Sequence, residues 1–187
     1  MAVPRELFVP SEKSSLAYID EDIALDRERY LMEPVSLARL LDVAEIQATD
    51  VVLEIGSATG YASALLSKLC LTVIGVESDV ELMNKARLLL DKLGCDNVIF
   101  YESPLASGYP QKAPYDVIFI NGGVEMLSEE IHGQLREGGR LVYVDYSSGI
   151  GRAVLERKVE GRLIKLSQFD ALVPVLKAFE KPQSFCL

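Results

Sequence analysis

The stretch VVLEIGSATG, residues 51–60, decides the fold of this chain. A short apolar run, VVLEI, ends in a glycine-containing turn, and YASALLSKLC (61–70) continues as a predicted helix. In open α/β sheets, ligands bind beyond the carboxyl ends of the strands, where the first strand-to-helix turn approaches them. Gly56 and Gly60 lack a Cβ and let the backbone come close to a ligand. We therefore expect a ligand site at this turn.

The alternation of apolar strands and amphipathic helices continues after this turn. Further strands are predicted at LTVIGVE (71–77), NVIFY (97–101), DVIFI (116–120) and RLVYVDY (140–146). Helices are predicted from Pro34, at about 125–135, and after Ser78, where Ser78 and Glu81 match a capping box and Gly94 ends the helix. Strands that are apolar throughout and alternate with helices indicate a parallel sheet covered on both faces.

The C-terminal part has a different pattern. VLERKV and RLIKLS flank Glu160–Gly161, which predicts a hairpin, and LVPVLKAF (172–179) is predicted to add another strand. The predicted fold is therefore α/β: a Rossmann-like doubly wound sheet, mostly parallel, with an antiparallel C-terminal edge.

Composition narrows the class of protein and its partners. The 187 residues are 49% hydrophobic and 25% charged, which is typical of one globular domain. The net charge of −9, without a cluster of Lys or Arg, argues against nucleic acid as a partner.

The cysteines and the N-terminus bear on the compartment. Cys70, Cys95 and Cys186 are far apart and form no CxxC pair, which favours a reduced, cytoplasmic protein without a metal site. We find neither a signal peptide nor an apolar stretch of membrane-spanning length, so no membrane partner is expected.

Two acidic residues point to the kind of ligand. A dinucleotide fingerprint would need glycine at positions 56, 58 and 61, but Ala58 and Tyr61 stand at two of them. Glu77 closes the second strand, where a carboxylate can accept hydrogen bonds from both ribose hydroxyls; alternatively, it only begins the next helix and favours its dipole. With Glu54 before the turn, these residues favour an adenosine-type ligand without a pyrophosphate. S-adenosylmethionine is the natural candidate.

The segment VLEIGSATGY (52–61) resembles the glycine-rich motif of class I S-adenosylmethionine-dependent methyltransferases. The chain further resembles the protein-L-isoaspartate O-methyltransferases at VPRELFVP (3–10), AYIDEDIAL (17–25), APYDVIFI (113–120) and QLREGGRLVY (134–143). The resemblance implies a protein-repair enzyme that methylates an isoaspartyl carboxylate of a protein or peptide and releases S-adenosylhomocysteine. It begins at residue 2, so we expect the helix that usually precedes it to be absent.

The resemblance also implies how the chain is organised. Residues 1–187 form one S-adenosylmethionine-dependent methyltransferase domain, with an irregular N-terminal substrate-side segment at 1–33 and an α/β core at 34–187. The glycine turn would wrap the methionine part of the cofactor, and Glu77 would hold the ribose. The expected cofactor-binding residues are Glu54, Gly56, Ser57, Ala58, Thr59, Gly60, Glu77, Ser78, Ser103 and Pro104. The expected substrate-side residues are Tyr30, Met32 and Asn121.

Three positions depart from the family pattern. Ala58 replaces the middle glycine of the turn, and a methyl group there is tolerable if φ stays negative. Pro104, in Ser103-Pro104-Leu105, stands opposite the usual aspartate of the turn that positions the adenine. The loop that usually reads QTIS-x-P falls on residues 29–34, where Met32 occupies the serine position and offers no hydroxyl. We therefore assign no catalytic residue.

Two alternatives remain open at this stage. The departures favour a catalytically weak or inactive protein that still binds the cofactor. Asn121 and Asp145, at the ends of two predicted strands, instead favour a small-molecule O-methyltransferase that uses a divalent cation. His132, the single histidine, is expected on a helix surface and not in catalysis.

Overall fold

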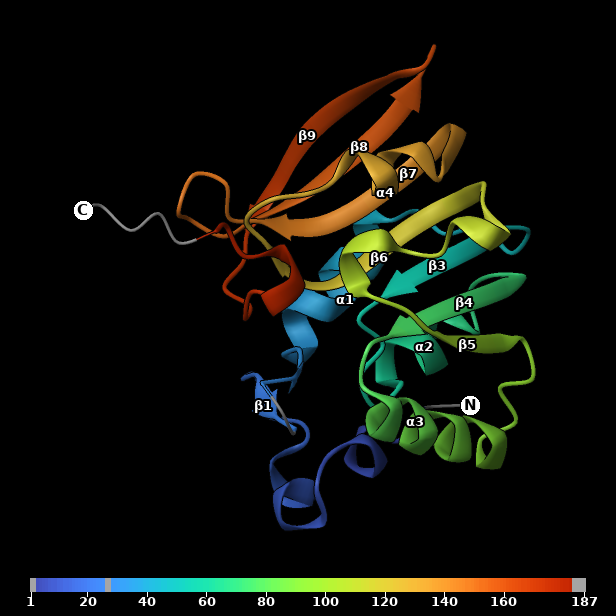
Figure 1. Cartoon of the computed structure of the whole chain (residues 1–187). Coiled ribbons are helices and arrows are strands. Elements are labelled where there is room, and N and C mark those ends of the chain that lie inside the picture. Colours follow the sequence, from blue (N-terminus) through green and yellow to red (C-terminus); the bar gives the residue numbers. More distant parts are fainter. Residues whose placement is uncertain (1–2, 26–27, 183–187) are drawn as a thin grey trace.

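Seven strands form one mixed sheet in the computed structural model, which describes residues 3–25 and 28–182 (Figure 1). The strand order is β5-β4-β3-β6-β7-β8-β9. The strands are β3 (Val51–Ile55), β4 (Thr72–Glu77), β5 (Val98–Glu102), β6 (Tyr115–Val124), β7 (Leu135–Asp145), β8 (Arg152–Val159) and β9 (Arg162–Asp170). β3 to β7 are parallel, whereas β8 and β9 are antiparallel to their neighbours. This confirms the predicted fold class.

The strand order creates a crevice beside β3. From β3 the chain continues to β4 and β5 on one side, and then crosses to β6 on the other. Such a reversal leaves the carboxyl ends of β3 and β6 without a covering connection, and this is where ligands bind in open α/β sheets. The turn at residues 56–60 lies at this switch point.

The two faces of the sheet are buried by different helices. Neighbouring residues of β3 alternate between the two sides, as the strand period requires: Val52 packs with α1 (Pro34–Val43) and α2 (Tyr61–Leu66), whereas Leu53 packs with α4 (Glu129–Gly133). The second face is also covered by the 3₁₀ helices Leu105–Ser107 and Lys177–Phe179.

The N-terminal segment is anchored by a buried cation. It consists of the 3₁₀ helices Arg5–Phe8 and Ser11–Leu16 and the short strands β1 (Ile23–Ala24) and β2 (Tyr30–Leu31), and it packs near α3 (Val80–Lys92). The Arg5 side chain, which has no solvent exposure, donates from Nε to the Ala17 carbonyl and from Nη2 to the Met32 carbonyl, both at 2.6 Å. Its guanidinium also lies 4.8 Å from the centre of the Tyr61 ring.

The hairpin prediction is confirmed, but the strand at 172–179 is wrong. Glu160 and Gly161 have φ of 52° and 71°, and they join β8 to β9 as a two-residue turn. In residues 172–179 the structure has only a single bridge from Val175 to Gly123, followed by a 3₁₀ helix. Pro174 has no N–H to donate to a ladder, so a regular strand is not continued there.

The predicted cap of α3 is displaced by one residue. Asp79, not Ser78, is the N-cap, and its carboxylate accepts hydrogen bonds from the Glu81 and Leu82 amides at 2.9 and 3.1 Å. The helices expected at 61–70 and 125–135 are shorter, at Tyr61–Leu66 and Glu129–Gly133, because β7 already begins at Leu135 and irregular backbone follows Leu66.

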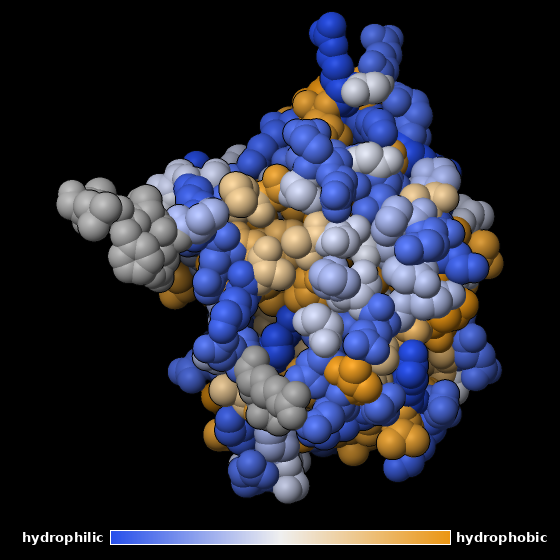
Figure 2. Space-filling view, in the orientation of Figure 1, coloured by the Kyte–Doolittle hydropathy of each residue, from blue (hydrophilic) through white to orange (hydrophobic). Residues whose placement is uncertain are grey.

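The face of the molecule shown in Figure 2 is mainly hydrophilic, with apolar areas between the polar ones. Within residues 3–25 and 28–182, no helix is long and apolar enough to cross a membrane. The outermost strand, β9, is largely exposed, and it carries the charged side chains of Arg162, Lys165 and Asp170.

Gly60 provides a test of how tightly the glycine turn is packed. It has φ of 89°, and an added Cβ would lie 2.9 Å from Leu90 Cδ1 and 3.0 Å from Ala86 Cβ. Gly94 also has a positive φ, of 65°, but an added Cβ would have no neighbour within 4 Å. We expect Gly94→Ala to lower the free energy of unfolding by about 1–2 kcal/mol. Overpacking should raise the loss in Gly60→Ala to about 2–5 kcal/mol. Urea unfolding measures both, and equal losses would contradict the packing argument.

Candidate functional site

The turn after β3 has an unusual backbone. Gly56, Ala58 and Gly60 all have positive φ, at 87°, 49° and 89°. A negative φ, the condition for a methyl group to be tolerated at this position, is therefore not met at Ala58. The left-handed conformation costs an alanine about 1–2 kcal/mol. This cost is offset because the Ala58 amide donates a hydrogen bond of 2.8 Å to the buried Glu77 carboxylate.

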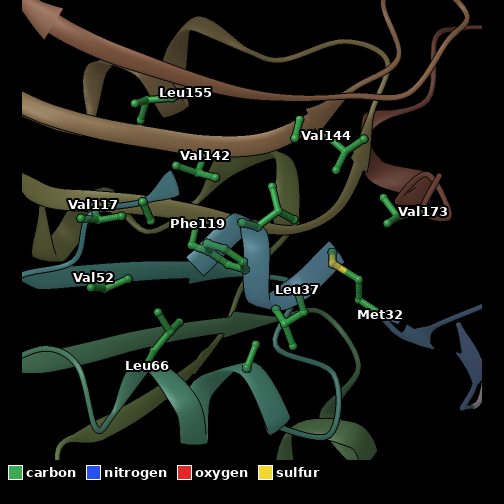
Figure 3. Packing of buried hydrophobic residues seen from close by; sticks show 14 of the residues in the cluster. Met32, Leu37, Val52, Leu66, Val117, Phe119, Val142, Val144, Leu155 and Val173 are labelled. Atoms are coloured by element: carbon green, nitrogen blue, oxygen red, sulfur yellow. The ribbon is translucent and has the colours of Figure 1, made fainter. Parts of the chain in front are cut away.

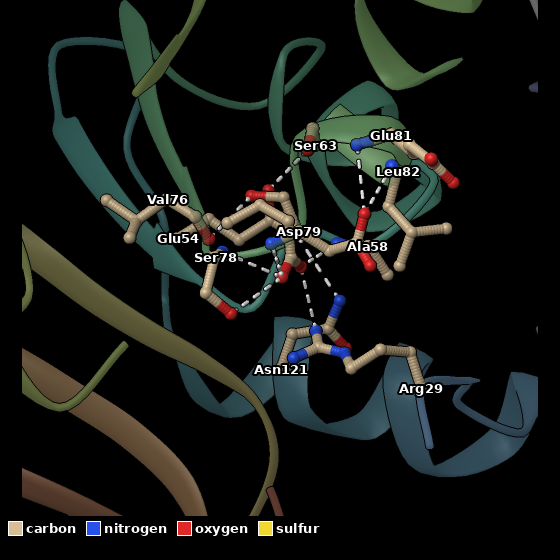
Figure 4. A network of polar contacts seen from close by, with 12 residues as sticks. Arg29, Glu54, Ala58, Ser63, Val76, Ser78, Asp79, Glu81, Leu82 and Asn121 are labelled. Carbon is tan, nitrogen blue, oxygen red and sulfur yellow. Dashed lines mark hydrogen bonds and ion pairs between the residues drawn. The ribbon is translucent and has the colours of Figure 1, made fainter. Parts of the chain in front are cut away.

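Glu77 joins this turn to the end of β4 and the beginning of α3. Its side chain has no solvent exposure, and it accepts hydrogen bonds from the amides of Ala58, Ser78 and Asp79 at 2.8, 2.8 and 3.2 Å. Arg29 completes the set, with Nη2 3.0 Å from Glu77 Oε2 (Figure 4). Glu77 thus orders the start of the helix, as the second interpretation of the sequence has it, and it lies beside the glycine turn, where the first interpretation expects a ribose.

An open pocket of about 540 Å³ lies directly outside this carboxylate. It is lined by Arg29, Glu77, Ser78, Asp79, Val80 and Glu81. Ser103 lies beside it, because its amide donates to the Glu77 carbonyl at 3.3 Å, and its hydroxyl is turned to the Gly108 carbonyl. Pro104 follows on the exposed surface. Glu77, Ser78 and Ser103 are therefore brought together at one end of the sheet.

Glu54 is a second buried carboxylate near the turn, in a different environment. It has no solvent exposure, and its partners are the neutral Ser63 hydroxyl and Asn121 amide, the latter at 3.3 Å (Figure 4). Burial raises the pKa of Glu54 to about 7, although these hydrogen bonds act in the opposite direction. Glu54 is thus a group that gains or loses its charge near neutral pH.

The expected substrate side is mostly filled by apolar side chains. Met32 is 4% exposed and belongs to the same hydrophobic cluster as Leu37 and Phe119 (Figure 3). The cleft that Met32 lines with Tyr30, Asn121 and Leu176 has a volume of only about 20 Å³. Met32 therefore acts as a core residue here, with only a narrow opening beside it.

Several predicted residues point elsewhere. The Thr59 hydroxyl donates to the Phe8 carbonyl at 2.7 Å and so binds the N-terminal segment. Ser57 is 1% exposed and lies inside the turn. Asp145 binds Lys165 at 2.6 Å, and the described residues contain no group of three or more His, Cys, Asp or Glu side chains suited to a metal ion. The alternative of a cation-dependent enzyme therefore gains no support from Asp145.

His132 lies away from the glycine turn, on α4. Its Nε2 is 3.1 Å from Glu156 Oε2 on β8, and this pairing with Glu156 raises the pKa of His132. Its side chain is 17% exposed, so it is less exposed than a surface position implies. The pair connects α4 to the antiparallel part of the sheet.

Sequence reasoning did not identify Arg29 and Leu176 as site residues. If Gly56 carried a Cβ, that atom would lie 3.3 Å from a side-chain atom of Leu176. A Cβ on Gly122 would lie 2.6 Å from another atom of the same side chain, so Leu176 fills the crevice between β3 and β6. Arg29 lies against both Gly56 and Glu77. For Arg29 the sequence did contain a signal, because this cation stands at the first position of the loop that usually reads QTIS-x-P.

Comparison with known proteins places these features in one family. The model of the family described as protein-L-isoaspartate(D-aspartate) O-methyltransferase (PCMT) matches residues 1–168. A protein-L-isoaspartate O-methyltransferase 2 of Pelobacter propionicus is 39% identical over 140 residues, which are 75% of this chain and 62% of that protein. A protein-L-isoaspartate O-methyltransferase of Koribacter versatilis is 34% identical over 175 residues, 93% of this chain and 79% of that protein. The chain thus spans about three fifths to four fifths of the length of these relatives.

Solved structures agree with the fold. A protein-L-isoaspartate O-methyltransferase superimposes with a TM-score of 0.80 and 29% identity, covering 93% of this chain and 58% of that chain. A putative PCMT from Plasmodium falciparum, determined in complex with S-adenosyl-L-homocysteine, has a TM-score of 0.73 at 21% identity and covers 93% of this chain and 86% of that chain. At that identity the second comparison supports the fold alone.

Glu54 generates a prediction for the pH dependence of stability. Because its pKa is raised in the folded state, the folded chain binds more protons than the unfolded chain between about pH 4.5 and about pH 7. As the pH rises from about 4.5 to about 7, the free energy of unfolding should therefore fall, and the contribution of Glu54 to this fall should be about 3 kcal/mol. Glu54→Gln should remove that component. The free energy of unfolding of the variant should therefore increase relative to that of the wild type as the pH rises. Denaturant unfolding across this range measures the difference, and parallel curves would contradict the assignment.

Proposed function

Because the chain belongs to the protein-L-isoaspartate O-methyltransferase family, we propose that it binds S-adenosylmethionine and transfers the methyl group to an isoaspartyl carboxylate of a protein or peptide. The observation that carries the proposal is the buried Glu77 carboxylate, which lies between the glycine turn and an open pocket of about 540 Å³. The expected cofactor residues Gly56, Ser78 and Ser103 adjoin it.

The residues present suit an adenosyl ligand. Glu77 Oε2 accepts from the Ala58 amide and pairs with Arg29, so it can take a ribose hydroxyl in the place of Arg29, and the missing side chain at Gly56 leaves space for the amino-acid part. Glu54 adds a carboxylate that favours a nearby cation when it is ionised. For this ligand to enter, the guanidinium of Arg29 must release Glu77.

The role of the chain in the reaction is positioning. S-adenosylmethionine supplies a methyl group on a sulfonium, and a carboxylate that attacks it is already ionised at neutral pH, so no general base is required. Holding the reacting atoms in line contributes roughly 7–11 kcal/mol in well-oriented reactions. Tyr30 and Asn121, which line the cleft of about 20 Å³ beside Met32, are the groups that would meet the substrate.

A second candidate function is adenosyl-ligand binding with little or no turnover. It is favoured by the filled substrate side, where Met32 is buried and Leu176 lies against Gly56 and Gly122. Both candidates require the same cofactor site, so they differ in the substrate cleft alone.

We expect the chain to act in the cytoplasm. Cys70 and Cys95 are free and buried, and free buried thiols are usual in a reducing compartment. Cys186 lies outside the described residues. The expected partner is a protein or peptide that carries an isoaspartyl residue; neither nucleic acid nor a membrane is part of the proposal.

Removal of the Glu77 charge tests the cofactor site. We expect wild type to bind S-adenosylhomocysteine in the micromolar range or weaker. Glu77→Gln should weaken binding by about 1–3 kcal/mol, because charge-assisted hydrogen bonds to the ribose are lost. Calorimetric titration measures the affinities, and circular dichroism verifies that the variant is folded. Glu102→Gln, at an exposed carboxylate on the neighbouring strand β5, is the matched control. Equal affinities of wild type and Glu77→Gln would remove Glu77 from the site.

Met32 tests the substrate side. We expect weak methyl transfer to an isoaspartyl peptide by the unmodified chain, and an increase in Met32→Ser, which adds the missing hydroxyl. Met32→Ala creates a similar cavity without a hydroxyl, and both variants should lose about 2–5 kcal/mol of unfolding free energy. Tritiated methyl transfer is measured at a temperature where all three proteins are folded.

The outcomes of this assay separate the two candidate functions. Equal rates in Met32→Ser and Met32→Ala would show that the hydroxyl contributes nothing. Full activity of the unmodified chain would show that Met32 does not limit the reaction. Cofactor binding without turnover in any of the three proteins would favour the second candidate.

A further inference from the structure

Arg29 is a buried cation that extends across the candidate site. Its side chain is 10% exposed, and Nη2 lies 3.0 Å from Glu77 Oε2. The guanidinium also lies against Gly56: a Cβ on this glycine would be 3.0 Å from the same Nη2 and 3.7 Å from Nη1. Figure 4 shows the side chain extending from the loop toward the turn that contains Ala58. One guanidinium thus reaches both the expected ribose acceptor and the expected position of the amino-acid part.

The hydrogen bonding of Arg29 is incomplete. A guanidinium has N–H donors in a planar fork, and a carboxylate is bound best by two of them in parallel. In the part of the chain that the structure describes, Glu77 is the ion-pair partner of Arg29, through Nη2, and the buried Nε has no hydrogen-bond partner. A buried donor without a partner is costly, so an acceptor that arrives from outside would be favoured there.

We propose that Arg29 binds the α-carboxylate of the adenosyl amino acid and exchanges Glu77 for it when the ligand enters. The inference rests on the proposed function, because it requires a ribose at Glu77. Ribose hydroxyls at Glu77 replace the contact that Arg29 makes there, and a buried guanidinium that loses its carboxylate needs another anion. The α-carboxylate is the anionic group of S-adenosylmethionine and of S-adenosylhomocysteine, and it belongs to the part expected beside Gly56.

The surroundings of Arg29 make this ion pair selective. Leu176 Cδ1 lies 3.3 Å from the same Cβ position on Gly56, so an apolar side chain closes the crevice next to the guanidinium. Exclusion of water on that side strengthens a charge pair, and it raises the cost of a ligand that brings no carboxylate. Arg29 is therefore a specificity-determining residue that separates the intact cofactor from adenosyl compounds without an amino-acid carboxylate.

A ligand series tests the inference. S-adenosylhomocysteine is compared by calorimetric titration with 5′-(3-aminopropylthio)adenosine, which lacks only the carboxylate, and with 5′-methylthioadenosine, which lacks the whole amino-acid part. We expect wild type to prefer S-adenosylhomocysteine over the aminopropyl compound by about 10- to 100-fold. In Arg29→Gln the preference should fall to about twofold or less, and in Arg29→Lys, which keeps the charge without the fork, it should be intermediate.

Lys177→Gln is the matched control, because Lys177 is a cation at a nearby ion pair, 3.2 Å from Glu28, but its side chain is 77% exposed. It should retain the full preference. Tighter binding of all three ligands by Arg29→Gln would show that Arg29 only closes the crevice, and an unchanged preference would show that it does not contact the carboxylate. Either result overturns the inference and leaves the proposed function intact. Absence of binding of every ligand to wild type and variants would overturn the proposed function itself.

Discussion

The buried carboxylate of Glu77 is the interaction on which the rest of the site depends. A carboxylate removed from water requires full compensation, and here it receives three backbone amides and one guanidinium. These groups come from the turn after β3, the end of β4, the start of α3 and the N-terminal loop. One side chain therefore fixes four segments relative to one another, at the point where the order of the sheet reverses.

The two buried acids of the site differ in what surrounds them. Glu54 faces the neutral groups Ser63 and Asn121, and its burial raises its pKa to about 7. Glu77 is held by amides and by the charged Arg29. The charge of Glu77 is thus compensated by groups of the protein itself. The hydrogen-bond partners of Glu54 are neutral, so a nearby cation would favour its ionised form. This difference suits a ligand that carries hydroxyls at one end and an ammonium group at the other.

The fold could be predicted where a local pattern decides the structure. The apolar runs, the turn at residues 56–60 and the Glu160–Gly161 hairpin each contain their own determinant, so periodicity and turn chemistry suffice. The strand expected at 172–179 failed because Pro174 interrupts an apolar pattern that otherwise fits. The positive φ of Ala58 could not be predicted, because the hydrogen bond that compensates it comes from Glu77, 19 positions later in the chain.

The candidate site could be predicted only in part, for the same reason. The position of Glu77 beside the glycine turn could be predicted, because it follows from the place of Glu77 at the end of a strand. The burial of Met32 depends on Leu37 and Phe119, which come from α1 and β6. The contact of Arg29 with Gly56 and Glu77 depends on how the N-terminal loop folds over the sheet. Such contacts between distant segments leave no periodic signal in the sequence.

The exposed position of β9 has a consequence for how copies of the protein meet one another. An outermost strand carries unpaired backbone groups along one side, and a second molecule can add to them as a further strand. β9 carries charged side chains, such as Lys165, and also the apolar side chains of Ile164 and Leu166, which are 48% and 44% exposed. The sheet therefore ends in a border of mixed charged and apolar character, and a second copy that covered it would remove both kinds of side chain from water.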